Sequence, residues 1–156
     1  MPYVMVSNKK CTGCHMCELA CSAWHEGAYR PSVSRLSVAV NPTTAQIKGR
    51  TCLQTACGKC AEACPEEAIE RLEIEVGAAG AEPVKGYVLK VNEEKCNDCG
   101  TCYDVCPTSV IKRHPGRGVA YKCDLCDGDP QCVAFCQNPH VLAVTLKVSK
   151  ADPELS

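Results

Sequence analysis

The sequence predicts a small α+β fold organised around bound metal, and three observations support this. Cysteine supplies sixteen of the 156 residues, a share at which a disulfide or metal scaffold becomes the default expectation. Short alternating segments typical of strands separate the cysteines. With one Trp, one Phe and five Tyr, the chain has little bulky apolar volume for a large core. We therefore expect the bound metal to supply much of the folding energy.

The balance of charged residues and the N-terminal sequence indicate which classes of protein are not expected. The chain has 17 basic and 18 acidic residues, so it lacks the basic field of a nucleic-acid-binding protein. Its first residues, MPYVMVSNKKC, have no secretory apolar core, and no apolar run approaches the roughly 18–20 residues of a membrane span. We expect a cytoplasmic protein with no membrane span. Thiols stay reduced there, so the cysteines indicate metal or redox chemistry rather than disulfides.

The sixteen cysteines fall into four groups with none left over. The first and third groups share the spacing C-x2-C-x2-C-x3-C, the second widens its first gap to four residues, and the fourth widens its middle gap to five. Two pairs of groups, over 11–64 and 96–136, indicate a duplicated two-motif unit. The groups are Cys11, Cys14, Cys17, Cys21; Cys52, Cys57, Cys60, Cys64; Cys96, Cys99, Cys102, Cys106; and Cys123, Cys126, Cys132, Cys136.

The segment between the first two groups predicts a hairpin. Residues 34–40 alternate apolar and polar side chains, as a half-buried strand does. The sequence NPTT follows as a turn, and residues 45–49 are expected to form the return strand.

Further strands are expected between and after the other groups. Residues 66–76 should begin with one helical turn after the proline of the second group and continue as a strand. A flexible turn over 77–83 should let residues 86–91 pair back. Residues 140–148 predict another strand, and residues 149–156 a loose tail. Strands 34–40 and 140–148 either pair inside the fold or offer edges to a partner.

The repeated spacing has a specific chemical use. C-x2-C-x2-C-x3-C-P is the bacterial ferredoxin signature for 4Fe–4S clusters, in which the fourth cysteine ligates the other cluster of a pair. Two intervening residues let the loop wrap a cubane, and the fourth cysteine lies on a helical turn directed away from it. The proline is expected at the first position of a short helix, because it has no N–H to satisfy. The sequence therefore predicts four 4Fe–4S clusters.

The outer groups depart from the signature. Ser22 and Gln137 follow the fourth cysteines there, where the inner groups have proline. We still expect Cys21 and Cys136 to be ligands.

Other cysteine chemistries fit the spacing less well. Zinc ribbons use two separated C-x2-C pairs to close a tetrahedron and do not require a third and a fourth cysteine in the same run. Thioredoxin-like chemistry needs one C-x2-C on a βαβ unit. The radical-enzyme spacing C-x3-C-x2-C does not occur. A structural zinc protein stays open as an alternative, which colour and bleaching by dithionite would exclude.

The order of the four groups resembles a known family. With CTGCHMCELAC first and YKCDLCDGDPQCVAFC last, the chain resembles the four-cluster iron–sulfur subunits of molybdenum and tungsten oxidoreductases. It is most similar to the small polyferredoxin-like subunit of bacterial tungsten aldehyde oxidoreductase, over about residues 3–148. The resemblance implies one domain over 1–156, a duplicated bacterial-ferredoxin-like module whose two units nest outer motifs with outer and inner with inner.

This nesting, combined with the crossing of the fourth cysteine, implies four ligand sets. They are Cys11, Cys14, Cys17 with Cys136 (cluster 1); Cys52, Cys57, Cys60 with Cys106 (cluster 2); Cys96, Cys99, Cys102 with Cys64 (cluster 3); and Cys123, Cys126, Cys132 with Cys21 (cluster 4).

The resemblance also implies a function. The chain would relay electrons between a tungsten- or molybdenum–pterin subunit that oxidises aldehydes and an FAD- and NAD-binding subunit, with no catalytic site of its own. The alternatives are a free ferredoxin-type carrier, or an electron-transfer subunit of a hydrogenase, a formate dehydrogenase or a carbon monoxide dehydrogenase. A row of clusters has two ends, so head-to-tail self-association into a filament is a further expectation to test.

A few other side chains stand near the cysteine groups. His15 and His25 are expected to be polar surface or loop residues, and Trp24 to pack under the first ligand loop. The basic residues near the loops offset cluster charge, dock a partner, or form a solvated face. They are Lys9, Lys10, Arg113, Arg117 and Lys122.

Overall fold

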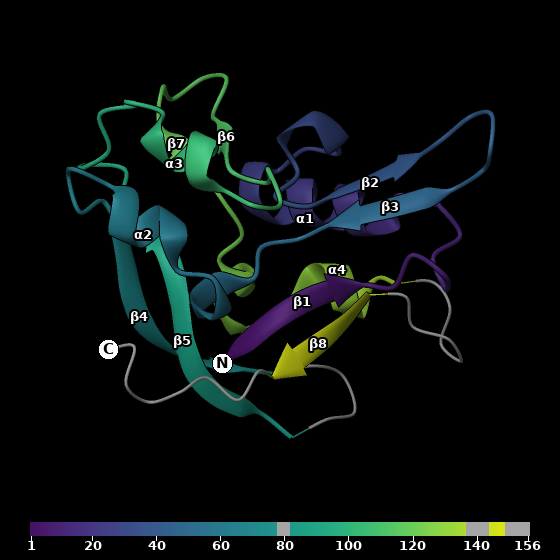
Figure 1. Cartoon of the computed structure of the whole chain (residues 1–156). Coiled ribbons are helices and arrows are strands. Elements are labelled where there is room, and N and C mark those ends of the chain that lie inside the picture. The colour runs from purple at the N-terminus through teal and green to yellow at the C-terminus, as the bar shows by residue number, and fades with distance from the viewer. Residues whose placement is uncertain (78–81, 137–143, 149–156) are drawn as a thin grey trace.

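The computed structural model describes residues 1–77, 82–136 and 144–148, and these ranges form a mixed helix–strand fold (Figure 1). Within them lie four two-stranded antiparallel sheets and four short α-helices. No helix in these ranges is long and apolar enough to span a bilayer. The predicted α+β class is confirmed at this level.

Strands from the two ends of the described chain pair with each other. β1 (Pro2–Val6) runs antiparallel to β8 (Val144–Val148), with Pro2 opposite Val148. The predicted strand over 140–148 is found in its last five residues. Its first four residues, and the predicted tail over 149–156, lie outside the described ranges. We did not predict β1 from the sequence.

Two further hairpins match the sequence expectations. β2 (Ser37–Val40) pairs with β3 (Ile47–Arg50), and β4 (Ile69–Val76) pairs with β5 (Val84–Val91). Each of the two predicted hairpins is therefore confirmed. Most of the predicted turn over 77–83 lies outside the described residues.

The predicted helical turn after the second group is wrong. Glu67 has φ +49°, and its N–H donates to the carbonyl of Cys64 at 3.3 Å, so the chain makes a tight turn instead. A left-handed residue cannot continue a right-handed helical turn, and it redirects the backbone into β4.

The prolines stop helices rather than start them. α2 (Lys59–Ala63) and α3 (Thr101–Val105) end at the fourth cysteines of their motifs, Cys64 and Cys106. Each proline comes directly after that cysteine, so the predicted first helical position is wrong. A proline has no N–H to donate and is common just past a helix end.

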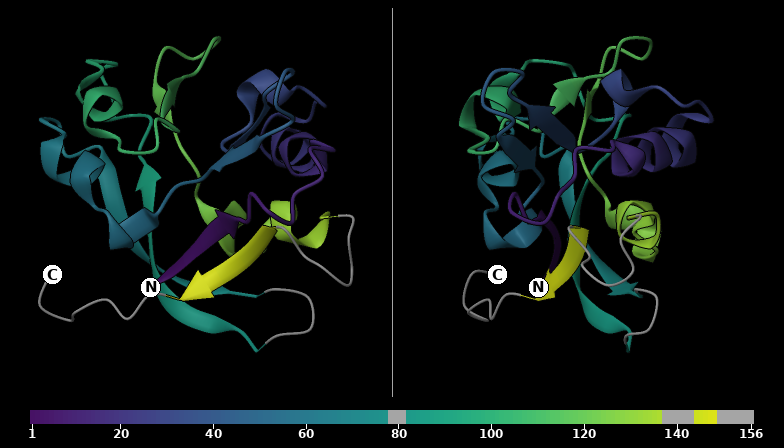
Figure 2. Two further views of the ribbon diagram at one scale, coloured as in Figure 1. Left: turned by 45° about the vertical axis from the view of Figure 1, so that its right-hand side comes forward. Right: turned by 90° about the vertical axis from the view of Figure 1, so that its right-hand side faces the viewer.

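The helices form two lobes at opposite sides of the molecule (Figure 2). In the outer lobe α1 (Met16–Glu26) contacts α4 (Gln131–Ala134), and in the inner lobe α2 contacts α3. The remaining elements are short. They are η1 (Pro31–Val33), η2 (Gln54–Ala56), β6 (Lys112–Arg113), β7 (Ala120–Tyr121) and η3 (Leu125–Gly128).

Cysteines make up a large part of the buried core. One group of buried residues, in the outer lobe, includes Cys17, Cys21 and Cys132 with the valines of β1 and β8. A second, in the inner lobe, contains Cys60 and Cys102. Both lobes therefore have cysteine side chains where a larger protein would have bulky apolar residues.

A buried carboxylate ties α1 to the β6–β7 turn. The Oε2 atom of Glu26 accepts from Nε2 of His114 at 3.0 Å, and the guanidinium of Arg117 donates to both carboxylate oxygens at 3.2 and 3.3 Å. Burial raises the pKa of Glu26, but these two donors outweigh it and hold the pKa below its ordinary value. The carboxylate is therefore charged at neutral pH, and its interactions stabilise the fold above the ordinary carboxyl pKa.

We expect Glu26→Gln to lower the free energy of unfolding of the loaded protein by about 1–3 kcal/mol at neutral pH, because it leaves buried donors poorly satisfied. The measurement is the urea midpoint under anaerobic conditions. Glu75→Gln is the matched control, since Glu75 is 55 % exposed and lies 4.0 Å from Lys85, and it should cost well under about 1 kcal/mol. Equal midpoints for the two variants would contradict the role of Glu26.

Candidate metal centres

Three of the cysteine loops share one backbone feature. The residue after the second cysteine has a left-handed conformation and caps the helix that follows: His15 (φ 60°), Gly58 (φ 67°) and Gly100 (φ 82°) begin α1, α2 and α3. Glycine adopts this conformation without strain, and histidine is among the side chains that tolerate it. The sharp reversal places the third cysteine in the first turn of the helix, facing back toward the loop. In the fourth motif the residue after the second cysteine, Asp127 (φ 52°), is also left-handed, but the helix that follows, α4, is capped by Pro130.

Each inner cavity is lined by cysteines from two motifs. One is lined by the third-motif cysteines Cys96, Cys99 and Cys102 together with Cys64 from the second motif. Its counterpart has the second-motif residues Cys52, Cys57 and Cys60, together with Cys106 from the third. These are the side-chain groupings that the crossed pairing predicts for clusters 3 and 2. The ligation itself stays a prediction.

The outer motifs also bring cysteines from distant parts of the chain together. Burial raises the pKa of Cys132 well above its ordinary value, and the neighbouring thiols of Cys123, Cys126, Cys21 and Cys17 act in the same direction. The first three of these neighbours form, with Cys132, the set predicted for cluster 4, whereas Cys17 belongs to the set predicted for cluster 1.

The set predicted for cluster 1 is less closely gathered. Cys11 and Cys14 lie near Cys17, where they add to the effect of burial on its pKa. Cys136 packs against the same buried group as Cys11 and Cys17. Cys14 is exposed. Ligation by this set stays a prediction too.

Backbone N–H groups point at the cysteine sulfurs. The first cysteines of three motifs, Cys11, Cys52 and Cys123, each accept from the N–H two residues further along, at 3.4, 3.4 and 3.5 Å. Three further acceptors are Cys64, Cys21 and Cys96, which receive the N–H groups of Ala68, Arg35 and Ala120 at 3.4, 3.3 and 3.4 Å. Such bonds favour negative charge on sulfur, which is the form that binds metal.

The buried thiols would hold their protons if metal did not displace them. Burial raises the pKa of Cys17 and of Cys126 to about 12, and that of Cys60 and of Cys102 to about 11. None of the sixteen cysteines forms a disulfide. Four-sulfur cavities with N–H donors fit an iron–sulfur cluster, and binding would replace these protons with iron.

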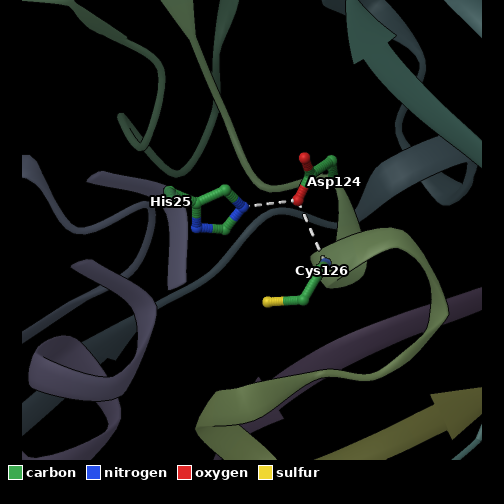
Figure 3. Close-up of side chains that lie close together, drawn as sticks. All are labelled: His25, Asp124 and Cys126. Carbon is green, nitrogen blue, oxygen red and sulfur yellow. Dashed lines mark hydrogen bonds and ion pairs between the residues drawn. The ribbon is translucent and has the colours of Figure 1, made fainter. Parts of the chain in front are cut away.

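His25 is not the surface or loop residue that we predicted. It lies on α1, with its side chain 6 % exposed, and its Nε2 donates to Oδ1 of Asp124 at 2.8 Å (Figure 3). Its Nδ1 faces the carbonyl of Cys21 at 2.9 Å and the sulfur at 3.7 Å. Burial lowers the pKa of His25, but the bonds to Asp124 and Cys21 raise it to about 9.

Asp124 connects His25 to two further groups. Its second oxygen accepts from Arg35 at 3.0 Å, and its first also accepts from the N–H of Cys126 at 3.0 Å. Burial raises the pKa of Asp124, yet the His25 bond and the Arg35 charge hold it well below the ordinary range. With its oxygens accepting these three hydrogen bonds, Asp124 braces the fourth loop. The spacing of 99 residues between His25 and Asp124 left no local signal from which to predict this contact.

Other predictions about single residues had mixed outcomes. Trp24 does not pack under the first loop, because it is 51 % exposed. His15 is a half-buried loop residue whose ring pairs with Glu18. Arg113 is exposed and pairs with Asp98. Lys122 is not part of a solvated face, because it is 2 % exposed.

Comparisons with known proteins agree with this chemistry. Residues 51–110 match the family of 4Fe–4S dicluster domains, and residues 8–24 match a 4Fe–4S binding domain. The chain is 36 % identical to the polyferredoxin-like subunit of aliphatic sulfonate oxidoreductase from Pyrococcus furiosus, over 86 % of this chain and 70 % of the relative. It is 30 % identical to the electron transport protein HydN of Escherichia coli, over 91 % and 87 %. Formate hydrogenlyase subunit 2 of the same organism is 28 % identical, over 99 % and 89 %.

Solved structures share the fold. A chain of the active-site complex BamBC of benzoyl coenzyme A reductase, in complex with 1,5-dienoyl-CoA, aligns with a TM-score of 0.52 at 23 % identity. The alignment covers 100 % of this chain and 81 % of that one. The same complex as isolated gives a TM-score of 0.51 at 24 % identity, over 99 % and 83 %.

Proposed function

This chain belongs to the polyferredoxin-like family of 4Fe–4S electron-transfer proteins, and from that membership we propose that it relays electrons through four clusters within a larger oxidoreductase. The observation that carries the proposal is its 36 % identity to the polyferredoxin-like subunit of a sulfonate oxidoreductase. That relative is a subunit of an enzyme complex, and this chain spans most of its length. At the coarser level, the protein is an iron–sulfur electron-transfer subunit of the oxidoreductase or hydrogenase type.

Different groups of the chain would have different roles in this electron relay. Four sets of four cysteines would hold the clusters, with the fourth cysteine of each motif crossing to the neighbouring set. When bound, the clusters supply one-electron redox chemistry. The backbone donors to sulfur and the burial of the loops limit solvent access, which tunes the potential of such sites.

We propose a tungsten- or molybdenum–pterin subunit that oxidises aldehydes as the electron donor, and a flavin subunit that reduces NAD as the acceptor. The resemblance of the four ordered cysteine motifs to the small subunit of tungsten aldehyde oxidoreductase supports these partners. The grouping of all sixteen cysteines into four cluster motifs, with none left over, supports a relay without catalysis of its own.

The test is anaerobic purification of the chain from native extract, followed by identification of its partners and analysis for iron, tungsten and molybdenum. We expect a heteromeric complex whose brown colour bleaches with aldehyde as the reductant. A monomer that no co-purifying subunit reduces would defeat the proposal. A colourless protein that contains zinc would instead support the alternative of a structural zinc protein.

A free electron carrier is the second candidate. Its support is the match to HydN, which is described as an electron transport protein, over most of both chains. The match to formate hydrogenlyase subunit 2 supports a third kind of partner, a formate-linked or hydrogenase-type complex. Native gel filtration distinguishes a free carrier from a subunit, and electron microscopy distinguishes a closed complex from a filament.

A further inference from the structure

Lys122 is a buried cation in the middle of the molecule. Its side chain is among the largest that are fully buried. Its Nζ donates to the side-chain oxygen of Gln54 at 3.2 Å, to the carbonyl of Cys123 at 3.0 Å and to the carbonyl of Leu89. These three oxygens come from η2, β5 and the segment before η3, so the ammonium group lies where the three segments meet.

All three acceptors of Lys122 are uncharged. Among the described residues, no carboxylate lies within ion-pair distance of its Nζ. Arg35, a half-buried cation nearby, differs in having Asp124 as its partner at 3.0 Å. Burying a cation without an opposite charge is costly, so the position of Lys122 requires a source of negative charge beside it.

The neighbours of Lys122 are cysteines of two different ligand sets. Burial raises the pKa of Cys60 to about 11, and the charge of Lys122 acts against that rise. Burial likewise raises the pKa of Cys123, with Lys122 again acting in the opposite direction. Cys60 belongs to the set of cluster 2 and Cys123 to the set of cluster 4.

The same place is the contact between the inner and outer lobes. Gln54 donates its N–H to the sulfur of Cys52 at 3.4 Å and its side-chain amide to the carbonyl of Cys123 at 2.8 Å. The thiol of Cys52 is also close enough to Cys123 to raise its pKa further. The segment that joins β7 to η3 passes from the inner lobe to the outer lobe here (Figure 2).

We propose that Lys122 is the fixed counter-charge at the junction between clusters 2 and 4, and that it favours the reduced state of both. The inference rests on the proposed cluster ligation. Thiolate-ligated clusters carry net negative charge, which increases on reduction, and a buried cation stabilises added negative charge more than a solvated one does. A single residue would thus stabilise the added electron on cluster 2 and on cluster 4, the two clusters between which electrons would pass from one lobe to the other.

The test compares the holoprotein with Lys122→Met, which keeps the length of the side chain and removes its charge. We expect the equilibrium constant for reduction to fall about tenfold at two of the four clusters, which is about 59 mV for a one-electron couple. The other two should change little. The readout is a redox titration followed by electron paramagnetic resonance, with iron content measured on the same samples.

Two controls separate charge from structure. Gln54→Met removes hydrogen bonds from the same site without changing its charge, and Lys85→Met removes an 86 % exposed cation. Neither should move the potentials of the two clusters together. Full iron with unchanged potentials in Lys122→Met, or an equal shift in Gln54→Met, would overturn the inference.

Lys122→Arg covers the case in which the neutral variant fails to assemble. It should keep full iron and potentials near those of the wild type, because it keeps the charge. If it loses clusters as Lys122→Met does, side-chain shape rather than charge is decisive and the inference fails. Wild-type protein without iron would instead defeat the proposed function itself.

Discussion

Removing iron from the anaerobically prepared protein is expected to abolish its cooperative folded state. The reason is the composition of the core: buried cysteines occupy both apolar groups, and the chain has only one Trp and one Phe. The four loops contain left-handed residues, and cluster binding would be a main source of the energy that holds them in place. Metal binding is then part of the folding free energy, as in other small metalloproteins.

The measurement is circular dichroism with thermal unfolding, before and after chelation under strictly anaerobic conditions. The loaded protein should contain about sixteen irons, from four clusters of four. The chelated protein should lose its cooperative transition and regain it on reconstitution with iron and sulfide. A stable apoprotein with a sharp transition, or a loaded protein with about eight irons, would contradict the prediction.

Crossed ligation of the inner clusters is expected to give two double variants with different iron contents. Cys64 lines one cavity with Cys99, whereas Cys57 lines the other. If the fourth cysteine crosses over, Cys64→Ala with Cys99→Ala removes two ligands from one cluster and leaves about twelve irons. Cys64→Ala with Cys57→Ala removes one ligand from each of two clusters and leaves about eight.

The two double variants control for each other, because each lacks Cys64 and the middle cysteine of one triad. Iron and sulfide analysis and the number of reducible clusters provide the measurement. The losses of iron caused by two substitutions should be strongly non-additive when both affect one cluster, and nearly additive when they affect two clusters. The reverse order of iron contents would show that Cys64 binds the same cluster as Cys57.

Local patterns predicted much of the metal chemistry. The spacing of the cysteines determines how each loop wraps, and alternation identified the hairpins β2–β3 and β4–β5 because neighbouring strands with short turns pair locally. The cysteine sets lining the inner cavities also agree with the crossing rule combined with the nesting that the family resemblance implies.

Contacts between distant segments could not be predicted in this way. His25 and Asp124 meet across 99 residues, and Lys122 is buried by residues from two other segments. A single histidine or lysine near a loop has no period or spacing that distinguishes burial from exposure. The prediction for Trp24 was wrong for the opposite reason, because a large apolar residue is usually buried and this one is not.

The antiparallel pairing of β1 with β8 has a consequence for biosynthesis. The inner ligand sets lie between residues 52 and 106, so their lobe has all its cysteines before the fourth motif has been translated. The outer lobe needs strands and cysteines from both ends of this sequence, and such long-range contacts form slowly. Until the fourth motif joins the fold, Cys11, Cys14 and Cys17 lack the partner Cys136, whereas the inner sites already have their full sets of cysteines. Oxygen or competing metals would do most damage in that interval, which makes the N-terminal motif the point at which maturation of this protein is most vulnerable.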